Sequence, residues 1–496
     1  MEDIKSLLSP AFIKFIKETD FNEILNKGKD VILSFLHSYP DNLPVCSDNL
    51  AGQYSTVFYY ADSLSEYEIC SYGKCFSLEE KENIRFGGQD EERIRRAESK
   101  LEYLSEIMVR NWTECCSEFI PLFAGGMKFN SRAKGNWGDY NASEWFLPEI
   151  VIFKTNQTSS GAPVSKILFN FLIKNEDEIQ ALITKINTIA EKSFHSPTEQ
   201  KKPPATLEKQ PWNEQKETLE WRELVDKGIK LIKTQKIQKV VFSILAEYKS
   251  GEEYSFGQLV NKIKQFKSGL NGAGCNGYVY KENESIFWGC SPEKLFSVKG
   301  LKLETEAVAG SISRGNNDKE DRLNEIQLLS SKKNLDEHNY VIDFIVTTLK
   351  EFSSRISFVK TPRIKKTAKV QHLWTPISAE LKSGFGDGKN TIPIFRLIYS
   401  LFPTPAVCGH PREKAFNAIK ENEKIDRGLF TGIVGWFNFH SANISVAIRG
   451  GLQKKNELTI FAGCGIVEES DAGSEYEETI LKMNNILSII NYENKQ

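Results

Sequence analysis

The alternation of hydrophobic and polar residues divides the chain into a mixture of strands and helices. Residues 167–173 (ILFNFLI) form a short apolar run typical of a buried strand, and residues 178–189 are expected to form a helix. Residues 119–129 (FIPLFAGGMKF) indicate a strand whose glycine pair marks a bend or a bulge. The first hundred residues are predicted to be mostly helical, and no chemistry is assigned to them.

The segment from Glu191 to Gln215 differs from its surroundings in composition. It is polar and contains four prolines, so we expect an exposed connection without regular secondary structure. This connection separates two parts of the chain. We expect a variable N-terminal portion, residues 1–200, that is integrated into the same fold as a catalytic region, residues 212–496.

Strands and long helices alternate irregularly after this connection. Helices are predicted over residues 218–233 and 256–266, with a strand over residues 239–248 between them. The absence of a regular strand–helix period favours an α+β fold with large, mainly antiparallel sheets over a doubly wound parallel sheet. The glycines of residues 269–277 lack the GxGxxG spacing, and there is no P-loop, so a nucleotide-binding enzyme is poorly supported.

Charge and composition exclude several other classes of protein. The 64 basic and 66 acidic residues give a net charge of -2, whereas a nucleic-acid-binding protein needs a basic face to release counterions. No apolar run reaches the roughly 20 residues of a membrane-spanning helix, and residues 1–10 do not have the pattern of a signal peptide. The nine cysteines have no disulfide or zinc spacing. We expect a cytoplasmic protein with reduced thiols and no membrane or nucleic-acid partner.

Lys239 is the first candidate for chemistry. In IQKVVFSIL, strand alternation places Lys239 on the same face as Ile237, Val241 and Ser243. An ammonium between apolar neighbours is desolvated, which lowers its pKa and lets it act as a base. The alternative, which the pattern alone favours, is a lysine at a strand end that reaches water.

A second candidate group consists of carboxylates near the C-terminus. The sequence Ser-Glu-Tyr-Glu at 474–477 is a capping-box pattern and predicts the start of a helix. Glu475, Glu478 and Lys482 then share one face of that helix. Two adjacent carboxylates repel each other unless a cation lies between them, and oxygen ligands of this kind suit Mg²⁺. The alternative is a solvated helix start in which Lys482 is an ordinary ion-pair partner.

Two further acids stand in unusual positions. Glu337 falls on the apolar flank of a predicted helix, where a carboxylate needs a partner or a metal unless it reaches solvent. Glu293 follows a strand at a Ser-Pro turn, from which it either points into a cleft or is simply exposed.

Several positions could bind an anionic substrate. Glycine-bearing turns at residues 309–311 and 463–465 could bind a carboxylate through backbone N–H groups. Arg449 alternates off a strand and could make a bidentate contact to a second carboxylate. His372 has the pattern of a core histidine more than that of a functional one.

Taken together, nine segments in order make the chain similar to the chorismate-utilising enzyme family, and within it to the isochorismate synthases. This resemblance implies an α+β sandwich of large, mainly antiparallel sheets flanked by helices. It covers the region from about residue 216 to the C-terminus, whereas the N-terminal half is similar to the family's variable portion. The segments are KVVFS (239–243), FWGCSPEKL (287–295), ETEAVAGSISRG (304–315), LLSSKKNLDEHNYVID (328–343), VQHLWTPI (370–377), FPTPAVCGHPREKA (402–415), DRGLFTGIVGWF (426–437), SVAIRG (445–450) and FAGCGIVEESDAGSEYEETILKM (461–483).

The resemblance also implies roles for individual residues. Lys239 matches the general base and Glu293 the general acid. Glu337 and Glu478 match Mg²⁺ ligands, and Glu475 would contribute directly or through water. The remaining matched positions would bind the substrate: Gly463, Gly465 and Lys482 at the ring carboxylate, Arg449 at the enolpyruvyl carboxylate, and Gly310, His372, Thr404, Ala406 and Phe430 elsewhere in the pocket.

The implied reaction is the Mg²⁺-dependent conversion of chorismate to isochorismate, by water addition at C2 and loss of the C4 hydroxyl. Hydroxide is a poor leaving group, since the pKa of bulk water is about 15.7, so an acid must protonate it and a base must activate the attacking water. The resemblance implies no amidotransferase subunit, and we expect a monomer. Menaquinone, siderophore and salicylate biosynthesis all remain open as the pathway.

The choice among related activities depends on few residues. Ammonia-using relatives usually lack a lysine at position 239, and aminodeoxychorismate synthases typically carry one where Ala309 stands, so both residues favour a water-using enzyme. Salicylate synthases share these features and then eliminate pyruvate, and they remain the alternative; anthranilate synthases are less favoured. Ile244 and Cys290 depart from the family pattern. Ile244 is expected to face away from Lys239 on the strand, so we expect it to alter packing and not to abolish activity. A non-catalytic relative is disfavoured because every matched polar position keeps a functional residue type.

Overall fold

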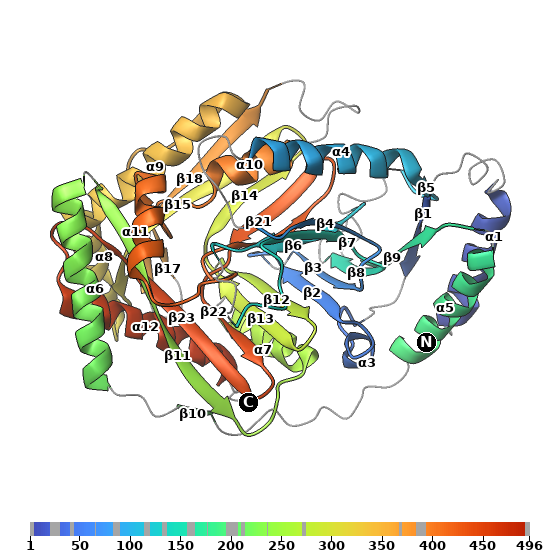
Figure 1. Ribbon diagram of the computed structural model, residues 1–496, viewed down its shortest axis with the longest axis horizontal. Coiled ribbons are helices and arrows are strands. Elements are labelled where there is room, and N and C mark those ends of the chain that lie inside the picture. Colours follow the sequence, from blue (N-terminus) through green and yellow to red (C-terminus); the bar gives the residue numbers. More distant parts are fainter. Residues whose placement is uncertain are drawn as a thin grey trace.

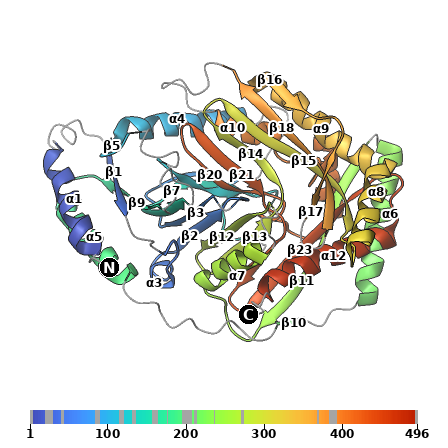
Figure 2. The same cartoon turned by 180° about the vertical axis from the view of Figure 1, so that it is seen from behind.

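The computed structural model describes residues 4–19, 30–39, 44–64, 66–82, 90–113, 120–130, 136–155, 164–175, 177–194, 207–209, 214–235, 237–269, 274–366, 370–382 and 393–491. Two large sheets form the centre of the molecule, and helices flank them (Figures 1 and 2). Among the described strand pairs, all but one are antiparallel, which confirms the expected α+β architecture.

The first sheet has 13 strands and contains most of the N-terminal strands together with several from the C-terminal part. In spatial order the strands are β10 (Leu207–Lys209), β11 (Lys239–Ser250), β23 (Glu457–Ile466), β22 (Gly450–Lys454), β13 (Ser285–Ser291), β12 (Asn276–Glu282), β2 (Thr56–Ala61), β3 (Tyr67–Tyr72), β8 (Ile150–Thr155), β9 (Val164–Ile173), β1 (Val31–Tyr39) and β5 (Met108–Arg110), with β19 (Gly409–His410) paired to β11.

The second sheet has ten strands. Their order is β16 (Ser353–Phe358), β18 (Val370–Leu381), β15 (Lys302–Ser313), β14 (Lys294–Lys299), β21 (Ser441–Val446), β20 (Ile433–Phe437), β6 (Phe123–Met127), β7 (Ser143–Leu147) and β4 (Phe76–Glu80), with β17 (Arg363–Lys366) paired to β18. N-terminal and C-terminal strands are direct neighbours in both sheets, because β2 pairs with β12 and β6 pairs with β20. The division into two portions at about residue 200 stays a prediction.

Helices cover the outer faces of the sheets and gather at the two ends of the molecule. Helices α6, α8, α9 and α12 lie at one end, and α1 and α5 lie at the other (Figures 1 and 2). No helix in the described ranges is long and apolar enough to span a membrane. The helices are α1 (Ile4–Glu18), α3 (Asp48–Ala51), α4 (Glu91–Ile107), α5 (Asp177–Phe194), α6 (Glu214–Gln235), α7 (Phe256–Gly269), α8 (Asp318–Ser330), α9 (Lys332–Phe352), α10 (Ile394–Leu401), α11 (Arg412–Asn422) and α12 (Ala472–Ile490).

An apolar layer between the two sheets makes the structure a sandwich. Phe58 and Tyr60 of β2 belong to the same buried cluster as Val434 and Trp436 of β20 on the facing sheet. The hydroxyl of Tyr60 crosses the layer and hydrogen-bonds Asn443 Oδ1 at 3.0 Å, so its polar end is satisfied inside the core.

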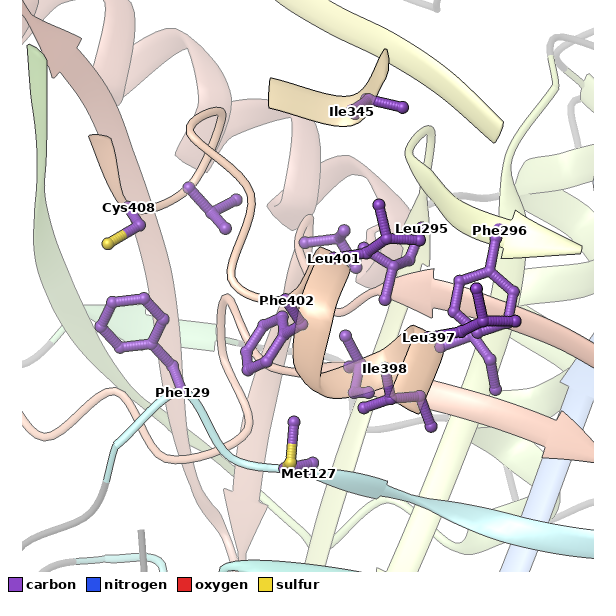
Figure 3. Packing of buried hydrophobic residues seen from close by; sticks show 14 of the residues in the cluster. Met127, Phe129, Leu295, Phe296, Ile345, Leu397, Ile398, Leu401, Phe402 and Cys408 are labelled. Atoms are coloured by element: carbon purple, nitrogen blue, oxygen red, sulfur yellow. The ribbon is translucent and has the colours of Figure 1, made fainter. Parts of the chain in front are cut away.

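The short helix α10 shows how an outer face is covered. Leu397, Ile398 and Leu401 point from this helix into the core, where they lie beside Phe296 and the residues around it (Figure 3). All of these side chains are fully buried. Truncation of any one of them to alanine is expected to cost about 2–5 kcal/mol, because a cavity would remain. The packing also fixes the chain that leaves α10 and forms one wall of the site described below.

Most elements expected after residue 160 are confirmed. They are the strands at 167–173 and 239–248 and the helices at 178–189, 218–233 and 256–266. The helical prediction for the first hundred residues is wrong, since β1 to β4 lie there. The connection at 191–215 is wrong in part: α5 and α6 extend into it, and Leu207–Lys209 pair with β11. Its residues 195–206 and 210–213 lie outside the described residues.

Candidate active site

One cavity gathers most of the residues singled out in the sequence. It measures about 900 Å³ including its opening to solvent, which is a size suited to a small-molecule ligand. Strands from both sheets and the helices α9 and α12 surround it. The predicted residues that line it are Glu293, Gly310, Glu337, His372, Ala406, Phe430, Arg449, Gly463, Gly465, Glu475, Glu478 and Lys482.

The two remaining predicted residues touch this set. Lys239 is fully buried at the start of β11, and its Nζ lies 2.6 Å from Oε1 of Glu337 on α9. The alternative of a lysine that reaches water is therefore wrong. Thr404 is buried and its hydroxyl donates to Glu293 Oε1 at 3.4 Å.

Gly465 makes the approach of Lys239 to Glu337 possible. A Cβ on Gly465 would lie 2.6 Å from Cε of Lys239 and 2.8 Å from Oε1 of Glu337. Both distances are shorter than real side-chain contacts, so a larger residue would push this pair apart. Gly463 and Gly465 lie within β23, which corrects the expectation of a glycine turn at 463–465.

Three carboxylates enter the cavity from α9 and α12, and each has a lysine partner. Besides the Glu337–Lys239 contact, Glu475 Oε1 lies 2.5 Å from Lys333 Nζ, and Glu478 Oε1 lies 2.7 Å from Lys482 Nζ. Burial would raise the pKa of Glu478, but Lys482, a hydrogen bond from Ser311 and the charge of Lys333 lower it to about 2. Glu478 is therefore ionised at neutral pH.

The helix that carries two of these acids begins earlier than expected. The side chain of Asp471 caps α12 by accepting a hydrogen bond from Ser474 N at 2.9 Å, so Asp471 and not Ser474 is the N-cap residue. Glu475 then falls in the first turn, where the helix dipole stabilises its negative charge.

These carboxylates suit a divalent cation in their chemistry. Carboxylate oxygens are the ligands that Mg²⁺ prefers, usually one or two of them together with waters and a substrate oxygen. In the described part of the chain, however, no three acidic, histidine or cysteine side chains are already gathered at metal-binding distance. The lysine contacts described above would have to open for a metal to bind.

Glu293 is an acid whose pKa is raised by its surroundings. It is 5% exposed, and it lies between β13 and β14 at the predicted Ser-Pro turn. Burial raises its pKa to about 7, with a further contribution from the charge of Glu306, while Lys239, Thr404 and Lys365 act in the opposite direction. A carboxyl with such a pKa can donate a proton near neutral pH.

Arg449 places a buried guanidinium group at the cavity. It follows β21 with a positive φ of 56° and is 8% exposed. Its Nη1 atom has no hydrogen-bond partner among the described residues, which is costly unless a ligand supplies one. Its Nη2 lies 3.5 Å from Nε2 of His372. Burial, Arg449 and Lys482 hold the pKa of His372 well below its usual value, so this histidine is neutral.

The glycine at position 310 creates a bulge at the edge of the cavity. It has a φ of +74° and lies at the register shift between Ala309 and Ser311 on β15, so this segment is a β-bulge and not a turn. The bulge directs the Ser311 hydroxyl to Glu478 Oε1 at 2.7 Å.

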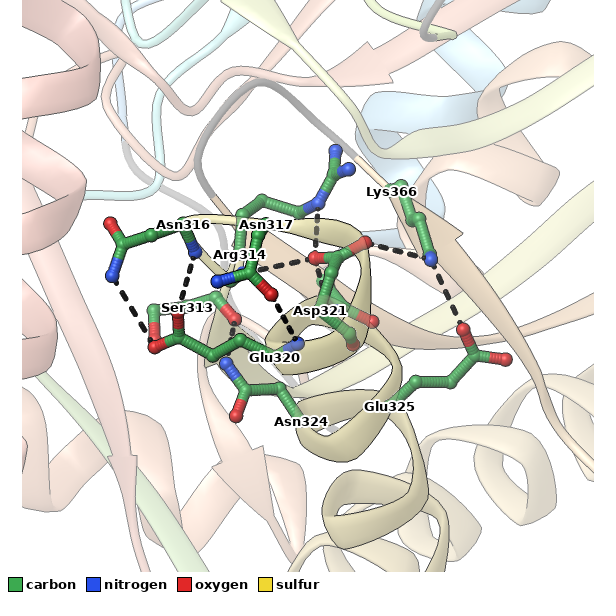
Figure 4. A network of polar contacts seen from close by, with 11 residues as sticks. Ser313, Arg314, Asn316, Asn317, Glu320, Asp321, Asn324, Glu325 and Lys366 are labelled. Carbon is green, nitrogen blue, oxygen red and sulfur yellow. Dashed lines mark hydrogen bonds and ion pairs between the residues drawn. The ribbon is translucent and has the colours of Figure 1, made fainter.

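A polar network anchors the strand that contains this bulge. Asp321, in the first turn of α8, accepts hydrogen bonds from Arg314 Nε at 2.7 Å and Lys366 Nζ at 2.9 Å (Figure 4). Its Oδ1 also accepts from Gln371 Nε2 at 2.8 Å, beside His372. The hydrogen bond from Arg314 is the main reason why the pKa of Asp321 lies below its ordinary value, and the bond from Lys366 adds to the effect. The network ties β15, β17 and β18 together behind the cavity.

Sequence reasoning missed several residues that shape the site. Lys333 lies four residues before Glu337, so helical spacing could have placed it on the same face. The ion pair between Glu423 and Arg427 also has a spacing of four residues, but it follows the end of α11 at Asn422. Arg427 is fully buried and donates to the backbone oxygens of Val241 at 2.7 Å and Val407 at 3.0 Å, which both line the cavity.

Comparisons with known proteins agree with this arrangement. Residues 19–491 match the chorismate binding enzyme family, and the chain belongs to that family. It is 27% identical to the isochorismate synthase MenF of Bacillus subtilis over 95% of this chain and 97% of that protein. It is also 28% identical to the salicylate biosynthesis isochorismate synthase of Pseudomonas aeruginosa, over 75% and 76% of the two chains.

Solved structures show the same fold. The menaquinone-specific isochorismate synthase MenF of Escherichia coli matches with a TM-score of 0.73 at 18% identity, over 97% of this chain and 99% of that one. Anthranilate synthase component I of Streptococcus pneumoniae matches with a TM-score of 0.61 at 18% identity, over 85% and 92%.

Proposed function

We propose that this protein is an isochorismate synthase that converts chorismate to isochorismate with the help of Mg²⁺. The observation that carries the proposal is the meeting of a buried lysine, a carboxyl with a pKa of about 7 and a buried arginine with a free donor at one cavity. The similarity to isochorismate synthases over nearly the full length of both chains supports the same activity.

Binding of the substrate begins with its two carboxylates. Arg449 would receive the enolpyruvyl carboxylate, because its unpartnered Nη1 can donate to an anion in a buried setting, where such a bond is strong. Lys482, whose Nζ donates to Gly463 O at 2.8 Å, would contact the ring carboxylate together with Gly463 and Gly465. Gly310, His372, Thr404, Ala406 and Phe430 would form the walls around the ring.

Proton transfer would be divided between Glu293 and Lys239. Glu293 would protonate the departing C4 hydroxyl, so that water leaves instead of hydroxide. Lys239 would accept a proton from the water that attacks C2. An amine accepts a proton only in its neutral form, so Lys239 would first have to lose its ammonium proton to solvent. Separation of Lys239 from Glu337, which lies 2.6 Å away, would favour that loss.

Glu337 and Glu478 would hold Mg²⁺, with Glu475 bound directly or through water. The bound ion would neutralise the ring carboxylate and withdraw electron density from the reacting ring. The protein's part is to release these carboxylates from Lys239, Lys333 and Lys482 when metal and substrate arrive.

The test is incubation with chorismate and Mg²⁺, followed by chromatographic separation of the products. Isochorismate as the main product supports the proposal. Salicylate with an equal amount of pyruvate would replace it with a salicylate synthase, whereas anthranilate formed from ammonia would indicate an ammonia-using enzyme.

We further propose that the protein acts in the cytoplasm as a monomer without an amidotransferase subunit. The cysteines of the described ranges are free, as is usual in a reducing compartment. Water as the nucleophile removes the need for a subunit that supplies ammonia. Size-exclusion chromatography with light scattering at several protein concentrations tests the monomer directly.

A further inference from the structure

A small charged cluster lies behind Glu293, outside the residues that line the cavity. Glu306 on β15 and Lys365 on β17 form an ion pair with a Nζ–Oε2 distance of 3.0 Å, and both side chains are largely buried. The indole Nε1 of Trp374 on β18 donates to the same carboxylate at 2.6 Å. Glu306 therefore has a fixed position beneath the site.

This cluster holds the chain on both sides of Glu293. Lys365 Nζ donates to the backbone oxygen of Pro292 at 2.5 Å, and the backbone N–H of Lys294 donates to Glu306 Oε1 at 2.9 Å. The residues immediately before and after Glu293 are thus tied to the two members of one ion pair. The backbone of Glu293 itself is held by the N–H of Val446, which donates to its carbonyl oxygen at 3.1 Å, and by Ser291 Oγ, which accepts from its N–H at 3.2 Å. The carboxyl of Glu293 has a longer contact of 3.4 Å with the hydroxyl of Thr404.

We propose that Glu306 and Lys365 are positioning residues that present the Glu293 carboxyl to the cavity and set its electrostatic surroundings. The inference rests on the proposed function only in the role given to Glu293 as the acid. The charged groups that act on the carboxyl of Glu293 include Glu306 from β15, Lys239 from β11 and Lys365 from β17, and the hydroxyl of Thr404 donates to it. Arg449, Glu337, Glu478 and Lys482 line the same cavity.

The two members of the pair act on Glu293 in opposite directions. The negative charge of Glu306 raises the pKa of Glu293, after the larger effect of burial, and the positive charge of Lys365 lowers it. Glu306→Gln should therefore lower the pKa of Glu293, and Lys365→Gln should raise it. A structural role alone would reduce activity in both variants but would not move a titration in opposite directions.

The first measurement is the pH dependence of kcat for chorismate turnover. Activity requires protonated Glu293, so it falls as pH rises through the pKa of that residue. We expect this alkaline limb to move to lower pH in Glu306→Gln and to higher pH in Lys365→Gln, each by roughly 0.5–1 pH unit, as one partly screened charge would cause.

The matched controls are Glu304→Gln and Lys302→Gln. These residues form an ion pair on the same strand β15, and they lie more exposed than Glu306 and Lys365. Each control substitution removes the same charge as its test substitution, but at a residue without a contact to the turn that carries Glu293. The alkaline limb of the kcat profile should therefore stay at the same pH in both control variants. A limb that moves equally in Glu304→Gln would overturn the proposal, because the effect would come from net charge.

The second measurement titrates Glu293 without turnover, by carbon NMR of protein labelled at glutamate carboxyls, with Glu293→Gln to assign its signal. Opposite shifts of this signal in Glu306→Gln and Lys365→Gln support the proposal. Unchanged titration in either folded variant overturns it. If the NMR titration of Glu293 shifts in opposite directions in the two variants but the pH dependence of kcat does not change, Glu306 and Lys365 do act on Glu293, but Glu293 is not the acid of the reaction. A failure of the proposed positioning role can therefore be distinguished from a failure of the proposed catalytic role. If one of the two variants does not fold, the remaining variant still tests the direction in which its own substitution should shift the pKa of Glu293.

Discussion

The buried pair of Glu423 and Arg427 offers a prediction that depends on the fold and on no assumption about the reaction. Both oxygens of Glu423 accept from Arg427, at 2.7 Å and 2.6 Å. Arg427 also donates to backbone oxygens of β11 and of the chain that follows α10. The pair therefore joins two walls of the cavity from behind.

Removal of both members should cost less than the sum of the two single removals. Glu423→Gln leaves the fully buried guanidinium of Arg427 without its counter-charge, and breaking a buried ion pair in this way costs about 3–5 kcal/mol. Arg427→Met also strands the carboxylate of Glu423 and the backbone oxygens of Val241 and Val407. In the double variant neither charge remains, so the loss should be smaller than the sum by about 1–3 kcal/mol.

The assay is urea unfolding of the four proteins at 25 °C, followed by tryptophan fluorescence. The chain has eight tryptophans, of which Trp221 lies in the same buried cluster as Val407, so fluorescence follows the unfolding of the molecule as a whole. Each single variant should lower the midpoint clearly, and the double variant should lose less stability than the two single variants lose together. Strictly additive losses, or single variants within about 0.5 kcal/mol of the parent, would refute the reasoning.

Three further outcomes follow from the site. Lys239→Ala should reduce turnover at least about a hundredfold while cooperative unfolding persists, and near-normal turnover would show that this lysine is structural. Excess EDTA should abolish activity and added Mg²⁺ should restore it; full turnover in EDTA would contradict the role of Glu337 and Glu478. The pKa of Glu478 lies below its ordinary value of 4.5 at about 2, so its contribution to stability is complete above about pH 4.5 and is lost as pH falls toward about 2. Glu478→Gln should therefore flatten the acid side of the stability profile, and an unchanged profile would argue against the ionised pair with Lys482.

The strands that sequence reasoning missed are those made by distant partners. Residues 56–61 (TVFYYA) form β2 because they lie between β3 and β12, and β12 follows more than 200 residues later in the chain. Strand formation depends strongly on such neighbours, which a local pattern does not contain. The same reason explains Leu207–Lys209, a short polar segment that becomes a strand by pairing with β11.

The site was more accessible to prediction than the N-terminal half. The order of nine motifs indicated the residues that meet at the cavity, and helical spacing alone placed Glu475 and Glu478 on one face. Spacing also indicates the Glu478–Lys482 pair, but it does not indicate the other partners. Lys333 beside Glu475 and Glu306 beneath Glu293 depend on three-dimensional contacts between separate elements.

The most direct test of the proposed activity measures isochorismate and pyruvate together. The purified protein is incubated with chorismate and Mg²⁺ near neutral pH, and a lactate dehydrogenase assay follows pyruvate while chromatography follows the ring products. We predict a reversible mixture in which isochorismate forms from chorismate, chorismate forms from added isochorismate, and no pyruvate is released. Stoichiometric pyruvate with fluorescent salicylate, or no conversion in either direction, would contradict the proposed function.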